Sequence, residues 1–225
     1  PAIFWYNKMI SMEKKGSERF MSVKKPQQYD NQSIKALKGA DRVRKRPGVI
    51  FGSDGLEGCE HSFFEILSNA VDEAREGHGD VITVTAFNDH SIEVDDHGRG
   101  VPLGFNQAEG RWNWDLIYCE LYAGGKYDNN AGGDYEYSLG LNGLGAAATQ
   151  CSSEFMKVQS YHTTEMLEMN FKKGEPDGEL IRTPLSRKEQ RTGTIVTWRP
   201  DLEVFTDTNI PKIFFETMLD RQAVV

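Results

Sequence analysis

Long hydrophobic runs are absent from this sequence of 225 residues. Its one apolar opening, residues 1–6, is far too short to span a bilayer, and it lacks the charged leader and small-residue cleavage site of a secretory signal. The sequence therefore predicts a cytoplasmic protein with no membrane partner. Its hydrophobic content of 38% is enough for one well-buried domain.

Cysteine is also scarce. The three cysteines, Cys59, Cys119 and Cys151, are far apart and odd in number, and none belongs to a Cys-x-x-Cys pair. This spacing predicts neither a disulfide framework nor a zinc site, so we expect the three side chains to be small buried hydrophobic groups.

Basic residues are fewer than acidic ones: the sequence has 26 Lys and Arg and 34 Asp and Glu, which gives a formal net charge of −8. Binding to duplex DNA depends on neutralising phosphates, so this balance argues against a chain that grips DNA over its whole surface. The one basic run, residues 42–46, could contact a phosphate locally or could be a solvated helix end. Charge alone favours the solvated helix end.

The hydrophobic pattern divides the chain into a flexible leader or arm at residues 1–28 and one domain at residues 29–225. A short helical pattern runs from Ser33 to Pro47 and is followed by a looped crossing up to Gly55. A long amphipathic helix is predicted at about 57–76.

The remaining pattern groups strands and helices in runs. The predicted elements are a hairpin of strands at 81–87 and 91–94, a short helix at 114–121, a glycine-rich stretch at 124–145, a helix starting near 144, strands at 155–160, 166–171 and 194–198 with a turn-rich connection at 174–184, and a helix at 209–225. This order predicts an α+β fold, a two-layer sandwich of a mixed, mostly antiparallel sheet with helices on one face.

Three polar residues, Glu65, Asn69 and Glu73, recur every four residues within the long helix. That spacing places them on one polar stripe while the apolar residues between them face a core. An acid, an amide and a second acid in one line supply a general base, a metal-ligating oxygen and a charge partner. These are the groups that water attack on a metal-bound phosphate requires.

Glycine-rich segments follow, and two familiar phosphate motifs are excluded. The segment 124–126 reads Gly-Gly-Lys and continues with Tyr127, without the upstream glycine of a P-loop. The segment 140–145 does not follow a predicted strand, which removes most support for a dinucleotide-binding turn. Backbone N–H groups at Gly143 and Gly145 could still hold a phosphate chain where the loop meets a helix start, and an ordinary capped helix is the alternative.

The segment 96–100, Asp-His-Gly-Arg-Gly, comes directly after a predicted strand. A carboxylate at Asp96 could accept a hydrogen bond from an exocyclic amine, and the glycines would let a ring lie against the backbone. The alternative is a strand-ending turn with an aspartate cap. The combination of the striped helix, Asp-x-Gly-x-Gly and a glycine-rich lid predicts a nucleotide site.

With these motifs the sequence resembles the GHKL ATPases, and within them the B subunits of bacterial type IIA DNA topoisomerases, DNA gyrase and topoisomerase IV. The resemblance covers residues 29–225 and implies the GHKL, or Bergerat, ATPase fold. Its motifs are the segments 43–48, 65–74, 96–102, 123–126 and 191–194. The Arg-Lys-Arg-Pro-Gly run in the first segment is typical of the topoisomerases. The alternative is another GHKL nucleotide-binding module, of the mismatch-repair, chaperone or kinase type, that does not act on DNA topology.

The resemblance implies a role for each matching residue. Glu65 would be the general base that orients the attacking water, with His61 as its partner, and Asn69 would be a ligand of Mg²⁺. Asp96 would read the adenine amino group. The resemblance makes Glu73 and Arg99 an ion pair over the adenine and places Thr194 beside Asp96 through a shared water. It places Gly98, Gly100 and Pro102 in the pocket wall and Tyr29 in the arm. The lid positions that it implies are Lys126, Tyr135, Gly140, Leu141, Asn142, Gly143, Leu144 and Gly145.

The resemblance also implies partners. Tyr29 and Ile34 resemble an arm that crosses to a second subunit, so ATP with Mg²⁺ would favour a homodimer. An A subunit of the gyrase or topoisomerase IV type, DNA held by other domains, and pocket inhibitors complete the expected partners. Tyr161 stands where many relatives carry an arginine that contacts aminocoumarins, which implies weakened binding of that drug class. The sequence ends before the family's second domain, so we expect the fragment to hydrolyse ATP only weakly.

Overall fold

The computed structural model describes residues 36–122 and 143–223. The chain divides into two units, Pro1–Ala36 and Leu37–Val225, and the fold below is that of the second unit. Its helices are α1 (Asp41–Arg44), α2 (Pro47–Phe51), α3 (Leu56–Arg75), α4 (Asn113–Tyr118), α5 (Gly145–Cys151) and α6 (Lys212–Gln222). Its strands are β1 (Ile82–Ala86), β2 (Ile92–Asp96), β3 (Phe105–Asn106), β4 (Arg111–Trp112), β5 (Ser153–His162), β6 (Glu165–Lys172), β7 (Glu175–Pro176), β8 (Ile181–Pro184) and β9 (Thr192–Pro200).

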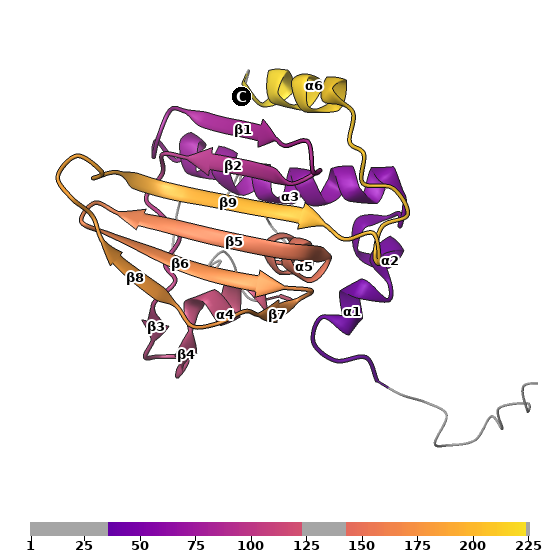
Figure 1. Ribbon diagram of the computed structural model, residues 1–225, viewed down its shortest axis with the longest axis horizontal. Coiled ribbons are helices and arrows are strands. Elements are labelled where there is room, and N and C mark those ends of the chain that lie inside the picture. Colours follow the sequence, from indigo (N-terminus) through magenta and orange to yellow (C-terminus); the bar gives the residue numbers. More distant parts are fainter. Residues whose placement is uncertain (1–35, 123–142, 224–225) are drawn as a thin grey trace, which may run out of the picture. The chain divides into compact units, whose positions relative to one another are not determined.

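Seven strands form one sheet in the order β1-β2-β9-β5-β6-β7, with β8 also paired to β6, and β3 and β4 form a separate pair. Each of these pairings is antiparallel. Helices α3, α4 and α5 lie on one face of the large sheet (Figure 1). The predicted α+β class is therefore confirmed.

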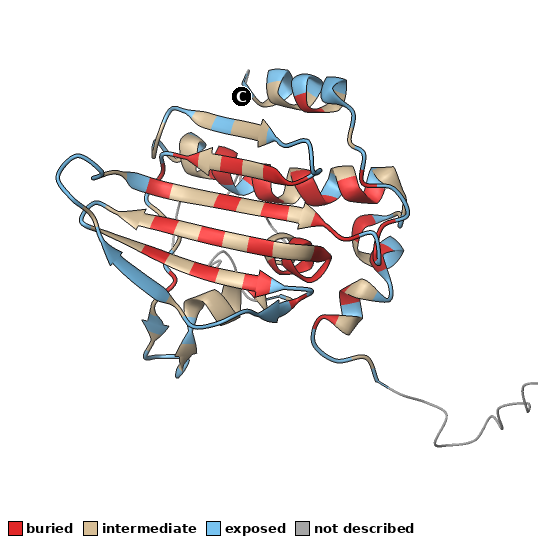
Figure 2. Cartoon of the chain, in the orientation of Figure 1, coloured by how far each residue is buried: buried red, intermediate tan, exposed pale blue. Residues whose placement is uncertain are grey.

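Burial alternates along the central strands (Figure 2). Val196 of β9 pairs with Val94 of β2 on one side and with Val158 of β5 on the other, and all three side chains are buried on the helical side. On the opposite face the partners are polar, as in the hydrogen bond from Gln159 to Glu168 at 2.9 Å. An antiparallel sheet with one packed and one solvated face has this pattern.

Helix α3 confirms the predicted long helix within one residue at each end. Its buried apolar residues recur at helical spacing and include Phe63, Ile66, Leu67, Ala70 and Val71. The Phe63 ring stacks on Trp198 of β9 with centroids 6.4 Å apart and meets Phe215 of α6 edge-on at 4.9 Å. This packing leaves the polar stripe of α3 facing away from the core. No helix in the described residues, α3 with its 20 residues included, is long and apolar enough to cross a membrane.

Three predictions of local structure are wrong. The helix expected between residues 33 and 47 is reduced, in its described part, to the four residues of α1, and Pro47 begins α2 where a looped crossing was expected. Proline suits a first helical position because no intrahelical partner exists there for the missing N–H. The expected turn-rich connection at 174–184 contains β7 and β8, and the β3–β4 pair was not predicted because two-residue strands carry no readable alternation.

Candidate functional site

Asp96 is the last residue of β2 and is only 8% exposed. Because side chains alternate along a strand, it continues the inward row of Ile92 and Val94 and faces the helical layer. Its Oδ1 accepts hydrogen bonds from the backbone N–H groups of Gly98 at 2.9 Å and Thr194 at 3.0 Å. Both bonds end on one oxygen, so Oδ2 is the atom that can accept from a ligand.

Burial raises the pKa of Asp96 above its ordinary value, the two backbone N–H groups oppose that rise, and the nearby Glu73 and Asp95 add to it. The buried Tyr118 lies close enough for the charge of Asp96 to matter, since burial first and Asp96 second raise the pKa of this phenol. Tyr118 is a core residue that packs on Phe171, and the sequence assigned it no role.

Glu73 of α3 and Arg99 form a bidentate pair. Arg99 Nη2 lies 2.7 Å from Glu73 Oε1, and Arg99 Nε lies 3.0 Å from Glu73 Oε2. Burial alone would raise the pKa of Glu73, but the hydrogen bonds from Arg99 outweigh it and lower that pKa. Gly98 lies between this pair and Asp96, because a Cβ on it would be 3.0 Å from Glu73 Oε2 and 3.1 Å from Asp96 Oδ1. The α3 stripe and the Asp96 carboxylate therefore meet at Gly98.

His61 and Glu65 lie one turn apart on α3, with His61 Nε2 3.0 Å from Glu65 Oε1. His61 Nδ1 lies 3.1 Å from the Phe51 carbonyl. On the other side, a Cβ on Gly145 would be 2.0 Å from Glu65 Oε2. The Glu65 carboxylate is thus held between an imidazole and the start of α5.

Asn69 is exposed and donates from Nδ2 to the Glu65 carbonyl at 3.1 Å, which leaves its amide oxygen for a ligand. Within the described ranges, no group of three or more His, Cys, Asp or Glu is arranged to hold a metal ion. The Asn69 amide oxygen is a group that could ligate a cation whose shell also includes ligand oxygens and water. Mg²⁺ accepts such a shell, whereas structural Zn²⁺ does not.

The loop after Asp96 is fixed to β5 and β9. Gly100 has φ +84°, and a Cβ on it would be 2.7 Å from the Tyr161 carbonyl. The Val101 N–H donates to Thr194 Oγ1 at 3.1 Å, and Ser160 Oγ donates to the Val101 carbonyl at 2.6 Å. These bonds hold the loop up to the exposed Pro102 against the ends of the two central strands β5 and β9.

Arg191, immediately before β9, lies at these strand ends, and the sequence assigned it no role. Its guanidinium donates to both carboxylate oxygens of Asp95 and to the Asp96 carbonyl at 2.8 Å, and it lies 4.8 Å from the centroid of the Tyr161 ring. Two consecutive acids at the end of a strand must face opposite sides of the sheet. That pattern was the available signal for a cation on the outer side.

The structure joins most of the described candidates into one network. Gly98 lies between the Asp96–Thr194 contact and the Glu73–Arg99 ion pair. From Glu73, the polar stripe of α3 continues to Asn69, Glu65 and His61. Gly143 and Leu144 lead into α5, and the Gly143 carbonyl accepts from the Tyr122 N–H at 3.1 Å. The predictions for Tyr29, Ile34, Lys126, Tyr135, Gly140, Leu141 and Asn142 lie outside the described residues. A separate cavity of about 230 Å³ lies between the β1–β2 turn and residues 208–215, and no candidate residue lines it.

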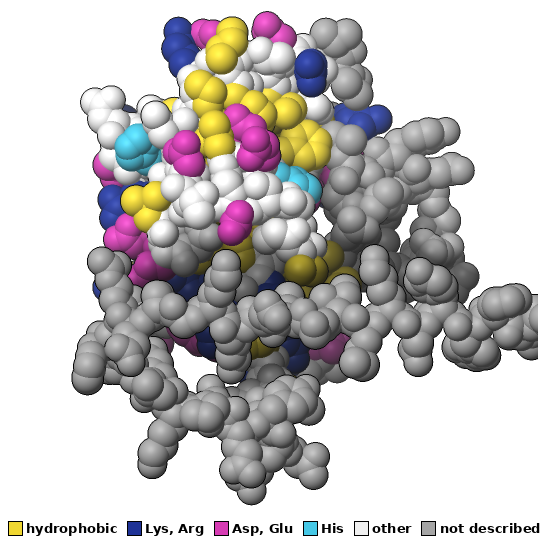
Figure 3. All heavy atoms as spheres, turned by 90° about the vertical axis from the view of Figure 1, so that its right-hand side faces the viewer, with side chains coloured by type: hydrophobic (Ala, Val, Ile, Leu, Met, Phe, Trp, Pro, Cys, Tyr) yellow, Lys and Arg dark blue, Asp and Glu magenta, His cyan; other side chains and the backbone are white. Residues whose placement is uncertain are grey.

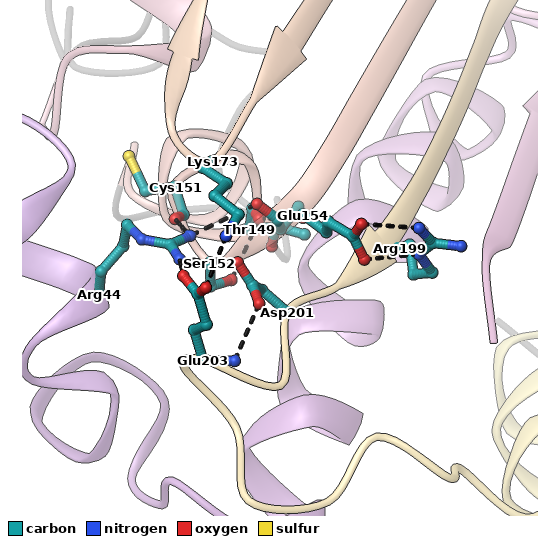
Figure 4. A network of polar contacts seen from close by, with 10 residues as sticks. Arg44, Thr149, Cys151, Ser152, Glu154, Lys173, Arg199, Asp201 and Glu203 are labelled. Carbon is teal, nitrogen blue, oxygen red and sulfur yellow. Dashed lines mark hydrogen bonds and ion pairs between the residues drawn. The ribbon is translucent and has the colours of Figure 1, made fainter. Parts of the chain in front are cut away.

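The basic run before Pro47 does not form a solvated helix end at Arg44, as charge alone suggested. Arg44 is 14% exposed and donates to the Cys151 carbonyl at 3.1 Å, to Asp201 at 2.6 Å and to Glu203 at 3.2 Å (Figure 4). It therefore ties the C-terminal end of α5 to α1 and to the segment after β9. Lys45 does fit the expectation, since it is exposed and pairs with Asp41 at 2.6 Å.

Comparisons with known proteins agree with this geometry. The chain is 40% identical over 185 residues to the B subunit of DNA topoisomerase 4 from Staphylococcus epidermidis, covering 82% of this chain and 27% of that protein. It is 34% identical over 193 residues to the B subunit of DNA gyrase from Thermotoga maritima, covering 86% and 29%. No protein-family model matches the chain.

A solved structure is also similar. The 43K ATPase domain of Thermus thermophilus gyrase B, crystallised with an aminocoumarin, matches with a TM-score of 0.69 and 30% identity, over 82% of this chain and 45% of that one. The chain spans under a third of the length of the curated relatives. It belongs to the B-subunit family of type IIA DNA topoisomerases and matches the part of these proteins that forms the GHKL ATPase domain.

Proposed function

We propose that this chain binds ATP between α3 and the end of β2 and hydrolyses its terminal phosphate. The observation that carries the proposal is the buried Asp96 carboxylate, whose Oδ1 is saturated by two backbone N–H groups while Oδ2 can accept from a ligand. An acceptor held in this way suits the exocyclic amine of adenine and is unsuited to a carbonyl oxygen.

The groups around Asp96 would complete the adenine site. Thr194 would bind the same amine through a shared water, while Gly98, Gly100 and Pro102 would form the wall. The Glu73–Arg99 pair would cover the ring, because a bidentate guanidinium presents a flat face. The ion pair itself is half-exposed, so its contribution is to shape more than to stability.

The triphosphate would extend along the α3 stripe towards Asn69 and Glu65. Glu65, oriented by His61 and by the start of α5, would position the attacking water and accept its proton. Asn69 would hold Mg²⁺ through its amide oxygen, and the bound ion would supply charge neutralisation at the phosphates. Backbone N–H groups of Gly143, Leu144 and Gly145, with Lys126, Tyr135, Gly140, Leu141 and Asn142 of the lid, would meet the phosphates.

For the whole protein we infer a type IIA topoisomerase B subunit. Similarity to topoisomerase IV and gyrase B subunits supports the inference that ATP binding closes a homodimer through an arm that includes Tyr29 and Ile34. Closure would drive DNA strand passage together with an A subunit. A differential affinity of ATP for the closed dimer is the physical requirement for this coupling.

Calorimetric titration with ATP in the presence and absence of Mg²⁺ tests the site. Asp96→Asn replaces an acceptor by a group that is partly a donor, and the mismatch should weaken ATP binding by about 10- to 100-fold, since a mispaired buried group costs about 1–3 kcal/mol. Asn69→Ala should remove the dependence of binding on Mg²⁺.

Asn170→Ala is the matched control, because Asn170 lies on the solvated face of β6 and donates to Glu168 at 3.0 Å, away from the site. It should bind ATP like the unchanged chain. Equal binding by Asp96→Asn, Asn69→Ala and the control would refute the site assignment.

A further inference from the structure

Arg191, immediately before β9, holds three strand ends together. Its planar fork binds the Asp95 carboxylate and the Asp96 carbonyl of β2, and its face covers the Tyr161 ring of β5. The side chain is 25% exposed, so the contacts are only partly screened by solvent. A guanidinium can make all three contacts at once because its donors and its flat face point in different directions.

These contacts lie on the side of the sheet opposite the proposed ATP site. Asp95 and Asp96 are consecutive in β2, so their side chains point to opposite faces, with Asp96 on the helical side. Ser160 is buried on the helical side, which places the next residue, Tyr161, on the outer face with Asp95. Arg191 therefore acts from behind the strand and cannot touch a ligand held by the Asp96 carboxylate.

On its β1 side Asp96 is still paired with Ile82, but on its β9 side the β2–β9 pairing ends one residue earlier, at Asp95. Arg191 donates to the Asp96 carbonyl at 2.8 Å, just beyond the end of the β2–β9 pairing. Gly193 approaches the same carbonyl so closely that a Cβ would lie 2.0 Å from its oxygen, and the Thr194 N–H binds the Asp96 side chain. Residues 191–194 thus fix both the backbone and the carboxylate of Asp96.

We propose that Arg191 is a positioning residue for purine selectivity: by clamping Asp95, Tyr161 and the Asp96 carbonyl, it holds the Asp96 carboxylate where it accepts the adenine amine. The proposal rests on the ATP site described above. Guanine presents a carbonyl oxygen in place of that amine, and a fixed carboxylate repels it. A carboxylate with a mobile backbone would lose contact with adenine and would reject guanine less strongly.

The chain contains a matched control at the other end of β9. Arg199 donates to Glu154 at 2.8 Å and covers the Phe155 ring with 5.3 Å between the guanidinium and the centroid. It therefore makes the same kinds of contact near the opposite end of β9, next to the start of β5 and not at Asp96. Replacing either arginine by alanine removes a guanidinium that binds a carboxylate and covers a ring. Only the change at Arg191 is expected to alter the preference between adenine and guanine nucleotides.

The experiment compares ATP and GTP affinities of the 225-residue chain and its Arg191→Ala, Arg199→Ala and Asp96→Asn variants by calorimetric titration, with thermal unfolding as a folding check. Arg191→Ala should lose about tenfold in ATP affinity, as expected for one weakened hydrogen bond, with GTP affinity unchanged or increased. Arg199→Ala should keep the ATP-to-GTP ratio of the unchanged chain.

An unaltered ratio in Arg191→Ala, together with a reduced ratio in Asp96→Asn, would overturn the role of Arg191 while leaving the ATP site standing. Equal loss of both nucleotides in Arg191→Ala would also overturn it, because a general loss of structure has no purine preference. Unaltered ATP binding in Asp96→Asn would instead refute the proposed function itself. If Arg191→Ala does not fold, Arg191→Lys keeps the charge without the planar fork, and an unchanged ratio in that variant would reject the proposal.

Discussion

At the scale of single residues, the distance between Gly145 and Glu65 controls the geometry of the proposed general base. Replacing a helical glycine by alanine normally stabilises a helix by up to about 1 kcal/mol. At Gly145, however, the new Cβ would lie 2.0 Å from Glu65 Oε2 and 2.9 Å from Glu65 Cδ, so the carboxylate must rotate away. That rotation would break the 3.0 Å contact with His61.

We therefore expect Gly145→Ala to fold with a melting temperature near that of the unchanged chain and to lose most of its ATP hydrolysis. A displacement of about 1 Å in a catalytic group costs roughly 100-fold in rate. Phosphate release under single-turnover conditions measures the loss. Gly104→Ala is the control, because no atom lies within 4 Å of its added Cβ. Equal hydrolysis in both variants would show that Glu65 needs no fixed orientation.

At the scale of elements, α5 is held at both ends. Its first residue abuts Glu65, and at its last residue the Cys151 carbonyl accepts from Arg44 of α1. Arg44 and Asp201 are both largely buried, with side chains 14% and 6% exposed. Removing one partner of a buried ion pair leaves an uncompensated charge, so Arg44→Ala should lower the free energy of unfolding by about 3 kcal/mol at neutral pH. Lys45→Ala, which removes only the exposed pair with Asp41, should cost under about 1 kcal/mol.

The same pair gives this loss a pH dependence. Burial would raise the pKa of Asp201, but the Arg44 hydrogen bond and other favourable contacts lower it below the ordinary 3.8. A carboxyl whose pKa is lower in the folded state stabilises the fold above its unfolded pKa, and this stabilisation is lost as pH falls through the folded pKa. Urea unfolding at neutral pH and below pH 3.8 should show the difference between Arg44→Ala and the unchanged chain shrinking in acid. A pH-independent difference would mean that Arg44 acts through packing alone.

Elements with a long and regular pattern could be predicted from the sequence. The twenty residues of α3 and the alternation of β2, β5 and β9 each give a strong periodic signal, and the motif around Asp96 could be placed at the end of a strand. Short elements could not be predicted, because Pro47 is equally suited to ending one helix and starting another. The site contacts of Arg191 and Gly145 depend on tertiary approach between segments distant in sequence, and no local pattern encodes those distances.

At the scale of the whole molecule, the charge distribution bears on DNA. The chain has a formal net charge of −8, and its basic run is largely engaged within the protein, since Arg42 donates to the Leu37 carbonyl while Arg44 and Lys45 pair with acids. On the described surface visible in Figure 3, Lys and Arg side chains are scattered and form no continuous area.

Because affinity for duplex DNA comes mainly from release of counterions by clustered cations, we expect this chain not to bind duplex DNA at physiological salt, with or without ATP. Fluorescence anisotropy of a labelled duplex across a salt series checks this, with the ATP titration of the same sample confirming that the protein is folded. An anisotropy change that weakens steeply with salt would contradict the prediction and would assign DNA contact to this domain. A flat response would support the proposal that, in the whole protein, closure on ATP binding and not direct contact of this domain acts on DNA.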